Sequence, residues 1–268
     1  MTRYRRELSL DSALAKVSFS KDGVDYKREF FVSYPANVMA VRFSASRGGK
    51  QDLRLSYVPN PVSTGKMTAD GADALCWTAW LDNNGMEYVV RVKAMAKGGT
   101  VANSDGKITV RGADEVVLLI TADTDYRANY DPDFNDPKAY VGVDPAQTTA
   151  GWIKKAAAKG YDGLLGEHLA DYSSLFAKVK LDINEASMGK DLPIGQRPPG
   201  QARLLSRTAL LPVWPLPAHS LVAPGQHAGQ PPGPMAQQRG RPLACGLPQQ
   251  HKPADELLAG LLHRPGTV

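Results

Sequence analysis

The chain of 268 residues has two cysteines, no long apolar run and no acidic excess. Neither Cys76 nor Cys245 has a near neighbour for metal ligation, so neither a disulfide framework nor a metal site is indicated. We expect Cys76 to be a small buried apolar residue. No run of 18 apolar residues occurs, which predicts no membrane-spanning helix. The first residues lack an apolar h-region, so no signal peptide is expected.

Aromatic and acidic residues become scarce near Leu192. By count from Asp191 onward, the last 78 residues hold no Phe or Tyr, three acidic residues and 14 of the 20 prolines. Residues 1–190 hold 25 Lys+Arg and 24 Asp+Glu, or +1, whereas the tail holds 7 and 3, or +4. The charges of the first part are interspersed, which argues against a phosphate-binding stripe and a nucleic-acid partner. Only this first part has the pattern of a folded domain.

Residues 1–143 predict a mainly β fold, an antiparallel β-sandwich. Apolar and polar side chains alternate along segments separated by short turns, which is typical of successive hairpins. Residues 59–71 are rich in Pro, Ser and Gly and are expected to form a loop. The continuously apolar run Val116–Ile120 is expected to be covered on both faces. The expected strands span residues 10–19, 24–32, 38–45, 53–58, 74–81, 87–96, 107–111 and 115–121.

Residues 144–190 predict two linker helices. Asp144 can cap the first helix, and Pro145 has the backbone angle that a first helical turn needs. We expect helices over 145–159, ended by Gly160, and over 161–179. The expected apolar stripe of the second helix consists of Leu165, Leu169, Tyr172 and Phe176.

Two polar groups could carry chemistry, but each has a structural explanation. His168 and Asp171 lie three residues apart and could form a catalytic pair, although no nucleophile motif accompanies them. We favour a polar edge where the helix meets another domain. The acidic loop 131–136 lacks the Gly and Glu of a calcium loop. We expect turns that cap their own backbone there, and no metal.

Trp77, Trp80 and Tyr88 could form a platform that stacks on sugar rings. Aromatic residues in strands are more often core residues or cross-strand pairs, and we favour that structural role. The pairs Gly48–Gly49 and Gly98–Gly99 are expected to be hairpin glycines. Taken alone, these residues predict a β-sandwich followed by two helices, with no catalytic constellation, cofactor or metal.

Two segments form a pattern that is specific in combination. The first extends from Tyr4 to Arg42 and the second from His168 to Asp182. The matching residues are Tyr4–Asp11, Gly23, Val24, Tyr26, Arg28, Glu29, Phe31, Ser33, Pro35, Val38, Val41, Arg42, His168, Asp171, Tyr172, Leu175, Phe176, Val179, Leu181 and Asp182. In this order they resemble the N-terminal domain of glycoside hydrolase family 95, the α-L-fucosidase family, over about residues 3–190. The resemblance implies a β-supersandwich and a helical linker leading into an (α/α)6 barrel, which holds the active site and cleaves fucose with inversion.

The chain departs from that family at both ends. Family members begin upstream of Thr2, and their barrel should start soon after Leu192. Residues 191–268 instead predict a disordered Pro-rich tail that arises from a shifted reading frame. Read from the second codon base, residues 211–260 are compatible with the family's first barrel helices over about 50 codons, by count. The competing interpretation is a genuine tail that binds SH3 or WW domains through Pro231–Pro234.

We therefore expect a fragment of a family 95 α-L-fucosidase. No residue can be assigned a catalytic role, and no fucose release is expected. The parent enzyme would act on a fucosylated glycan in the periplasm or outside the cell, with a Glu as general acid and an activated water. One alternative is a carbohydrate-binding or structural β module with Trp77 and Trp80 as sugar contacts. Another is an inert product whose exposed strand edges cause aggregation.

Overall fold

The computed structural model describes residues 1–133, 135–136 and 138–178. Those up to Phe176 belong to one of the two compact units into which the chain divides; of the other, Ala177–Glu256, only residues 177 and 178 are described. The tail 191–268, the shifted-frame segment and the end of the expected linker therefore lie outside the described residues. Among the described residues, no helix is long and apolar enough to cross a membrane.

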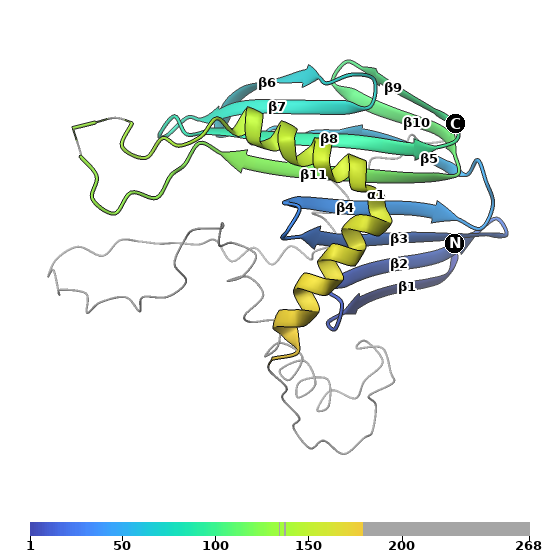
Figure 1. Ribbon diagram of the computed structural model, residues 1–268. Helices are drawn as coiled ribbons and strands as arrows, with labels where there is room; N and C mark the ends of the chain where they lie inside the picture. Colours follow the sequence, from blue (N-terminus) through green and yellow to red (C-terminus); the bar gives the residue numbers. More distant parts are fainter. Residues whose placement is uncertain (134, 137, 179–268) are drawn as a thin grey trace, which may run out of the picture. The chain divides into compact units, whose positions relative to one another are not determined.

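Two antiparallel sheets form the β part of this unit (Figure 1). The large sheet has the order β1-β2-β3-β4-β11-β8-β7-β6, and the small sheet has the order β5-β10-β9. The strands of the large sheet are β1 (Thr2–Ser9), β2 (Leu14–Lys21), β3 (Val24–Ser33), β4 (Val38–Ala45), β6 (Ser63–Ala69), β7 (Ala74–Leu81), β8 (Glu87–Lys97) and β11 (Glu115–Thr124). Those of the small sheet are β5 (Gln51–Ser56), β9 (Thr100–Ser104) and β10 (Lys107–Ala113). The expected antiparallel sandwich is confirmed.

The chain crosses between the sheets at turns that meet near Asp114. A carboxylate oxygen of Asp114 accepts a hydrogen bond from the backbone N–H of Gly49, between β4 and β5, at 2.7 Å. Gly99, between β8 and β9, has φ +67°, and a Cβ there would lie 2.6 Å from the backbone nitrogen of Ala113. The prediction that Gly48–Gly49 and Gly98–Gly99 are hairpin glycines was wrong, because each pair joins strands of different sheets.

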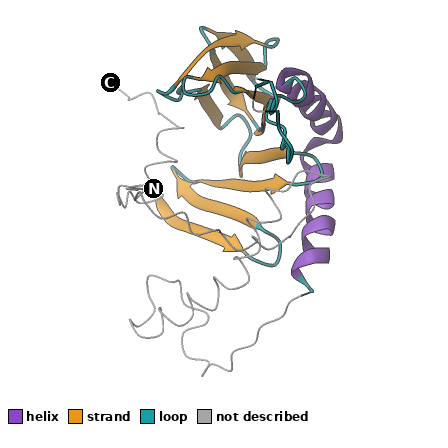
Figure 2. Cartoon of the chain, turned by 90° about the vertical axis from the view of Figure 1, so that its left-hand side faces the viewer, coloured by secondary structure: helices purple, strands orange, loops and turns teal. Residues whose placement is uncertain are grey.

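The central strand β11 is covered on both faces, as its apolar run predicted. Val117 and Leu119 belong to a core cluster shared with the helix α1 (Pro145–Phe176). Val116 and Leu118 belong to a second cluster, which includes residues of the small sheet. Figure 2 shows the helix along one face of the large sheet. Burial on both faces explains why this strand lacks the alternation of its neighbours.

The helix α1 consists of two helical segments that meet at Gly160. The backbone there has φ 68° and ψ 175°, which is not helical. The two expected helices are therefore present but are joined without a loop. Asp144 caps the first segment as predicted, since its carboxylate accepts the N–H of Ala146 at 2.8 Å. An ion pair between Lys159 and Glu167, at 2.5 Å, spans the break.

The buried stripe of the second segment differs from the predicted one. Leu165 and Leu169 are only half-buried. The buried residues are Tyr161, Leu164, His168 and Tyr172. A histidine can occupy this stripe because its ring stacks on Phe31 and one of its ring nitrogens has a backbone partner. The hydrophobicity pattern could not anticipate either contact.

Three predictions about strand bounds were wrong. Residues 59–71, expected to form a loop, contain the edge strand β6, and the edge strands β1 and β9 were not expected. Residues 10–13, expected to belong to a strand, form the turn between β1 and β2. Edge strands depend on pairing with one neighbour, and that turn is held by contacts to α1. Both features therefore depend on tertiary contacts, which a local sequence pattern does not contain.

Candidate functional site

Trp77 lies in an aromatic cluster inside the sandwich. It is 7% exposed, and its ring contacts that of Tyr57 with centroids 5.3 Å apart. Its indole N–H donates to the hydroxyl of Tyr88 at 3.3 Å, and that hydroxyl is also 2.7 Å from the hydroxyl of Ser63. Trp77 is therefore a core residue with a satisfied polar atom.

The two tyrosines of this cluster have perturbed pKa values. Burial, followed by the hydrogen bond to Tyr88, raises the pKa of Tyr57 to about 12. Burial alone would raise the pKa of Tyr88, but hydrogen bonds from Ser63, Trp77 and Tyr57 outweigh it and lower that pKa. Tyr57 lies at the end of an expected strand and Ser63 in an expected loop, so the sequence pattern predicts no site at either residue.

Trp80 lies on the opposite face of the large sheet from Trp77. Successive strand residues alternate between the two faces, and the two tryptophans are three residues apart in the same strand. Trp80 is 42% exposed. The strand register places Thr64 and Glu87 beside it. The two tryptophans therefore do not form one platform. Trp80 alone offers an exposed ring between a hydroxyl and a carboxylate, which could stack on a sugar ring and bond its hydroxyls.

Several carboxylates gather where β8 and β11 meet the start of α1. Burial raises the pKa of Glu87, and the nearby carboxylates of Asp144 and Asp125 raise it further. Burial also raises the pKa of Asp123. Within the described ranges, no group of three or more His, Cys, Asp or Glu side chains could hold a metal ion. These carboxylates can accept hydrogen bonds from hydroxyl groups.

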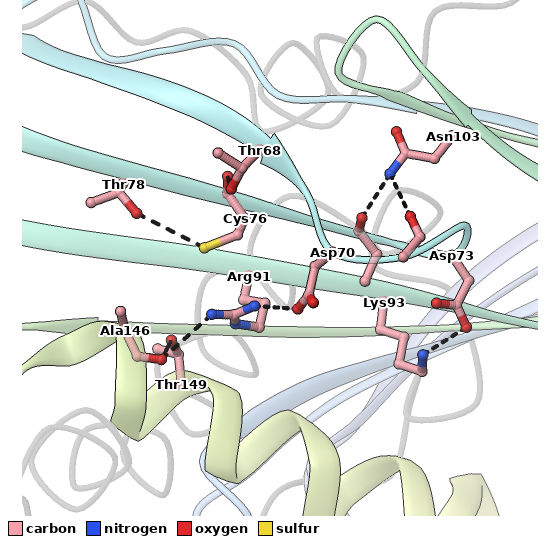
Figure 3. A network of polar contacts seen from close by, with 12 residues as sticks. Thr68, Asp70, Asp73, Cys76, Thr78, Arg91, Lys93, Asn103, Ala146 and Thr149 are labelled. Atoms are coloured by element: carbon pink, nitrogen blue, oxygen red, sulfur yellow. Dashed lines mark hydrogen bonds and ion pairs between the residues drawn. The ribbon is translucent and has the colours of Figure 1, made fainter.

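Arg91 is the centre of a polar network beneath the start of α1 (Figure 3). Its side chain pairs with Asp70, after β6, and also donates to the carbonyl of Ala146 at 3.4 Å. Nearby, Lys93 pairs with Asp73 at 2.6 Å. Arg91 is 8% exposed, so its charge requires the Asp70 carboxylate. The network attaches the first helical segment to the sheet, a role that sequence reasoning missed.

His168 and Asp171 do not form a pair among the described hydrogen bonds and ion pairs. His168 is 4% exposed, and its Nε2 lies 2.9 Å from the carbonyl oxygen of Ser12. The expected polar edge was therefore wrong, because the ring lies in the centre of the buried stripe. Tyr172 makes a similar contact with the same turn, because its hydroxyl donates a hydrogen bond to the carbonyl of Leu10 at 2.6 Å. Together the two side chains hold the first hairpin turn.

The described part of the acidic loop contains the predicted turns. The carboxylate of Asp133 accepts the N–H of Asn135 at 2.9 Å, and that of Asp136 accepts the N–H of Lys138 at 2.8 Å. These are turns in which side chains cap their own backbone. The prediction for Cys76 is also confirmed, since its thiol is free and buried.

Residues 1–129 match the family model "Glycosyl hydrolase family 65, N-terminal domain". The "Alpha-L-fucosidase 2" of Arabidopsis thaliana is 30% identical over 207 residues, which is 69% of this chain and 24% of that protein. The "Probable alpha-fucosidase A" of Aspergillus niger is 28% identical over 200 residues, which is 71% of this chain and 24% of that protein. A solved structure assigned as a kojibiose phosphorylase from the human microbiome is 9% identical with a TM-score of 0.42, covering 65% of this chain and 25% of its own. That overlap is too loose to support a structural argument.

The chain spans about a quarter of the length of the two fucosidases it matches. The family model and both relatives agree on the class of protein, and the sandwich described above is the structure of the matched segment. Residues 1–129 therefore form a domain of the kind found at the N-terminus of glycoside hydrolases.

Proposed function

We propose that this chain carries the N-terminal β domain of a glycoside hydrolase family 95 α-L-fucosidase. The similarity to two fucosidases over about 70% of the chain supports the proposal. The observation that carries it is a contact between the two segments of the family pattern. Tyr172 and His168 bond the carbonyls of Leu10 and Ser12 at 2.6 and 2.9 Å, and His168 stacks on Phe31. Segments more than 150 residues apart thus form one structural unit.

In this proposal, residues 1–143 form the β domain and 144–190 form the linker to the catalytic barrel. The packing of α1 on the sheet supports a linker with a defined direction at Phe176. The parent enzyme would hydrolyse terminal α-L-fucosyl linkages with inversion, using a carboxylic acid to protonate the leaving oxygen and a carboxylate to activate water. We place that parent enzyme in the periplasm or outside the cell.

The proposal includes a change of reading frame close to residues 192–195. The two fucosidase matches leave 31% and 29% of the chain unmatched. The tail 191–268 has 78 of 268 residues by count, which is also about 29%. A foreign tail of this length is compatible with both matches. Sequencing the gene tests the idea. A continuous barrel frame one base away is expected, and the absence of that frame would contradict the proposed change of reading frame.

We predict that the purified chain releases no fucose from a 2′-fucosylated oligosaccharide, whereas a protein expressed after restoring the frame does. The physical reason is that the two carboxylates needed for glycoside hydrolysis would belong to the barrel. The measurement is the amount of free fucose, determined by chromatography at intervals over a day. Release by the unmodified chain would overturn the predicted inactivity, and an inactive but folded restored-frame protein would overturn the assignment as a fucosidase.

A second candidate function is carbohydrate binding through Trp80. The observation that favours it is the exposed ring of Trp80 between Thr64 and Glu87, in contrast to buried Trp77. In that case the domain would be a binding module, and the sugar would lie on the side of the large sheet where α1 packs.

We expect Trp80→Ala to weaken binding of a fucosylated oligosaccharide about fivefold or more, since loss of a stacked ring costs on the order of 1 kcal/mol. Tyr130→Ala is the matched control, because Tyr130 is an aromatic residue that is 90% exposed and lies in the loop between β11 and α1. Calorimetric titration provides the measurement. Equal affinity in the two variants would exclude Trp80 as a sugar contact.

A further inference from the structure

A groove of about 490 Å³ lies at one end of strands β1 to β4. Its volume is within the range of small-molecule sites. Residues of the large sheet and its turns line it, on the half of the sheet that contains the edge strand β1. It shares no residue with the aromatic cluster, the Trp80 surface or the Arg91 network.

The lining of this groove is more basic than the rest of the fold. It holds four cations and two carboxylates, or +2 by count. By contrast, residues 1–178 hold 23 Lys+Arg and 22 Asp+Glu, or +1 in total. The charged lining residues are Arg3, Arg5, Lys16, Lys27, Glu7 and Asp25. The groove therefore concentrates positive charge on a nearly neutral domain.

Two arginines of the groove are held in place while keeping free donors. Arg3 donates from Nε to the hydroxyl of Ser20 at 2.9 Å and from Nη2 to Asp25 at 2.6 Å. Arg5 uses Nε and Nη2 on one oxygen of Glu7, at 3.0 and 2.8 Å. In the described part of the chain, Nη1 of neither arginine has a partner. A guanidinium has five N–H donors, so both retain donors for a ligand.

Lys16 is the surplus cation of the groove. The strand register places it between Glu7 and Glu29, but Glu7 pairs with Arg5 and Glu29 pairs with Lys27 at 2.8 Å. No ion pair of Lys16 occurs within the described ranges. Its ammonium group can therefore bind an anion without breaking an existing pair.

Hydroxyl groups complete the lining. Ser18 and Ser44 flank Lys27 on neighbouring strands, and neither hydroxyl has a hydrogen-bond partner in the described part of the chain. Cations and hydroxyls together suit a small polar ligand with a negative group.

We propose that this groove binds the carboxylate or sulfate group of an acidic saccharide. The saccharide part rests on the proposed function, whereas the anionic part rests on the charges of the groove alone. Lys16 and the free edges of Arg3 and Arg5 bind the anion, and Ser18 and Ser44 bond hydroxyl groups of the sugar ring.

The test is calorimetric titration of the full chain at low salt with glucuronate, glucose 6-sulfate, glucose and inorganic sulfate. Both acidic sugars are expected to bind, and glucose about tenfold more weakly or not at all. Higher salt should weaken the binding, because exposed charges are screened. We expect Lys16→Gln to weaken binding about fivefold, as for loss of an exposed charge contact. Lys66→Gln on the opposite edge strand β6, an exposed lysine outside the groove, should not change it.

Equal binding of glucose and glucuronate would overturn the role of charge, and no binding of either acidic sugar would overturn the site. Inorganic sulfate binding as tightly as glucose 6-sulfate would overturn the saccharide part. An unchanged affinity in Lys16→Gln, with unchanged thermal unfolding, would also count against the proposal. These outcomes do not depend on fucose release, so failure of the proposed function would appear separately, in the restored-frame protein.

Discussion

Replacing Gly160 by Ala is expected to lower the free energy of unfolding by roughly 2–3 kcal/mol, because a backbone at φ 68° and ψ 175° is accessible almost only to glycine. A Cβ at this position would meet no atom within 4 Å, so the cost is one of backbone conformation and not of packing. Urea unfolding of the full chain, followed by circular dichroism, provides the measurement.

The break at Gly160 has a packing function. The buried residues of the first segment are Pro145, Thr149, Ile153 and Ala156, and those of the second are Tyr161, Leu164, His168 and Tyr172. At about 100° per residue, a straight helix would point these two sets about a third of a turn apart. The non-helical backbone at Gly160 turns the buried side of the second segment back toward the sheet. Ile153 and Leu164 therefore reach the same core cluster.

Gly151→Ala and Gly166→Ala are matched controls, since both positions are helical and a Cβ would again meet no atom within 4 Å. Each is expected to stabilise the protein by about 0.5–1 kcal/mol, the usual gain of Ala over Gly inside a helix. Should Gly160→Ala be neutral or stabilising like these controls, the two segments would not need the glycine conformation.

Replacing Leu119 by Ala is expected to lower the free energy of unfolding by about 3–4 kcal/mol, through lost burial and the cavity left behind. Leu119 is fully buried in the centre of β11, in one cluster with Leu164 of α1. Leu118, its neighbour in the chain, is buried in the cluster on the opposite face. Leu118→Ala and Leu119→Ala therefore remove the same side-chain atoms from opposite faces of one strand.

Double-mutant cycles with Leu164→Ala distinguish the two sides. Coupling on the order of 1 kcal/mol is expected for Leu119→Ala, whereas Leu118→Ala should be additive within about 0.5 kcal/mol. Coupling of Leu118 and Leu164, or none between Leu119 and Leu164, would contradict the assignment of the two faces. Leu→Val substitutions at the same positions keep the test usable if a double alanine variant fails to fold.

Most of the β structure could be predicted from local patterns. Short turns and alternating side chains locate eight of the strands, and the unbroken run of β11 indicates cover on both faces. The edge strands β1, β6 and β9 could not be predicted, because their stability depends on one paired neighbour. Neither could the crossing between sheets at Gly48–Gly49 and Gly98–Gly99, where a hairpin and a crossing have the same glycine signature.

The candidate site was less predictable than the fold. The spacing of Trp77 and Trp80 indicates opposite faces once both are placed on one strand, but which face is buried depends on the small sheet. Arg91 resembles any polar strand residue until α1 lies over it. His168 resembles a polar edge until Phe31 and the carbonyl of Ser12 are in place.

By itself, the sequence determined the β class of the fold, the helix break at Gly160, the cap at Asp144 and the two segments that resemble a fucosidase. These properties follow from local backbone preference and residue order, which a sequence contains directly. The contacts between distant strands and the helix establish that those two segments touch, that Trp80 is exposed while Trp77 is a core residue, and that basic side chains of neighbouring strands meet in a groove. These depend on strand register and on which face each sheet covers, and such long-range pairings are not present in any local pattern.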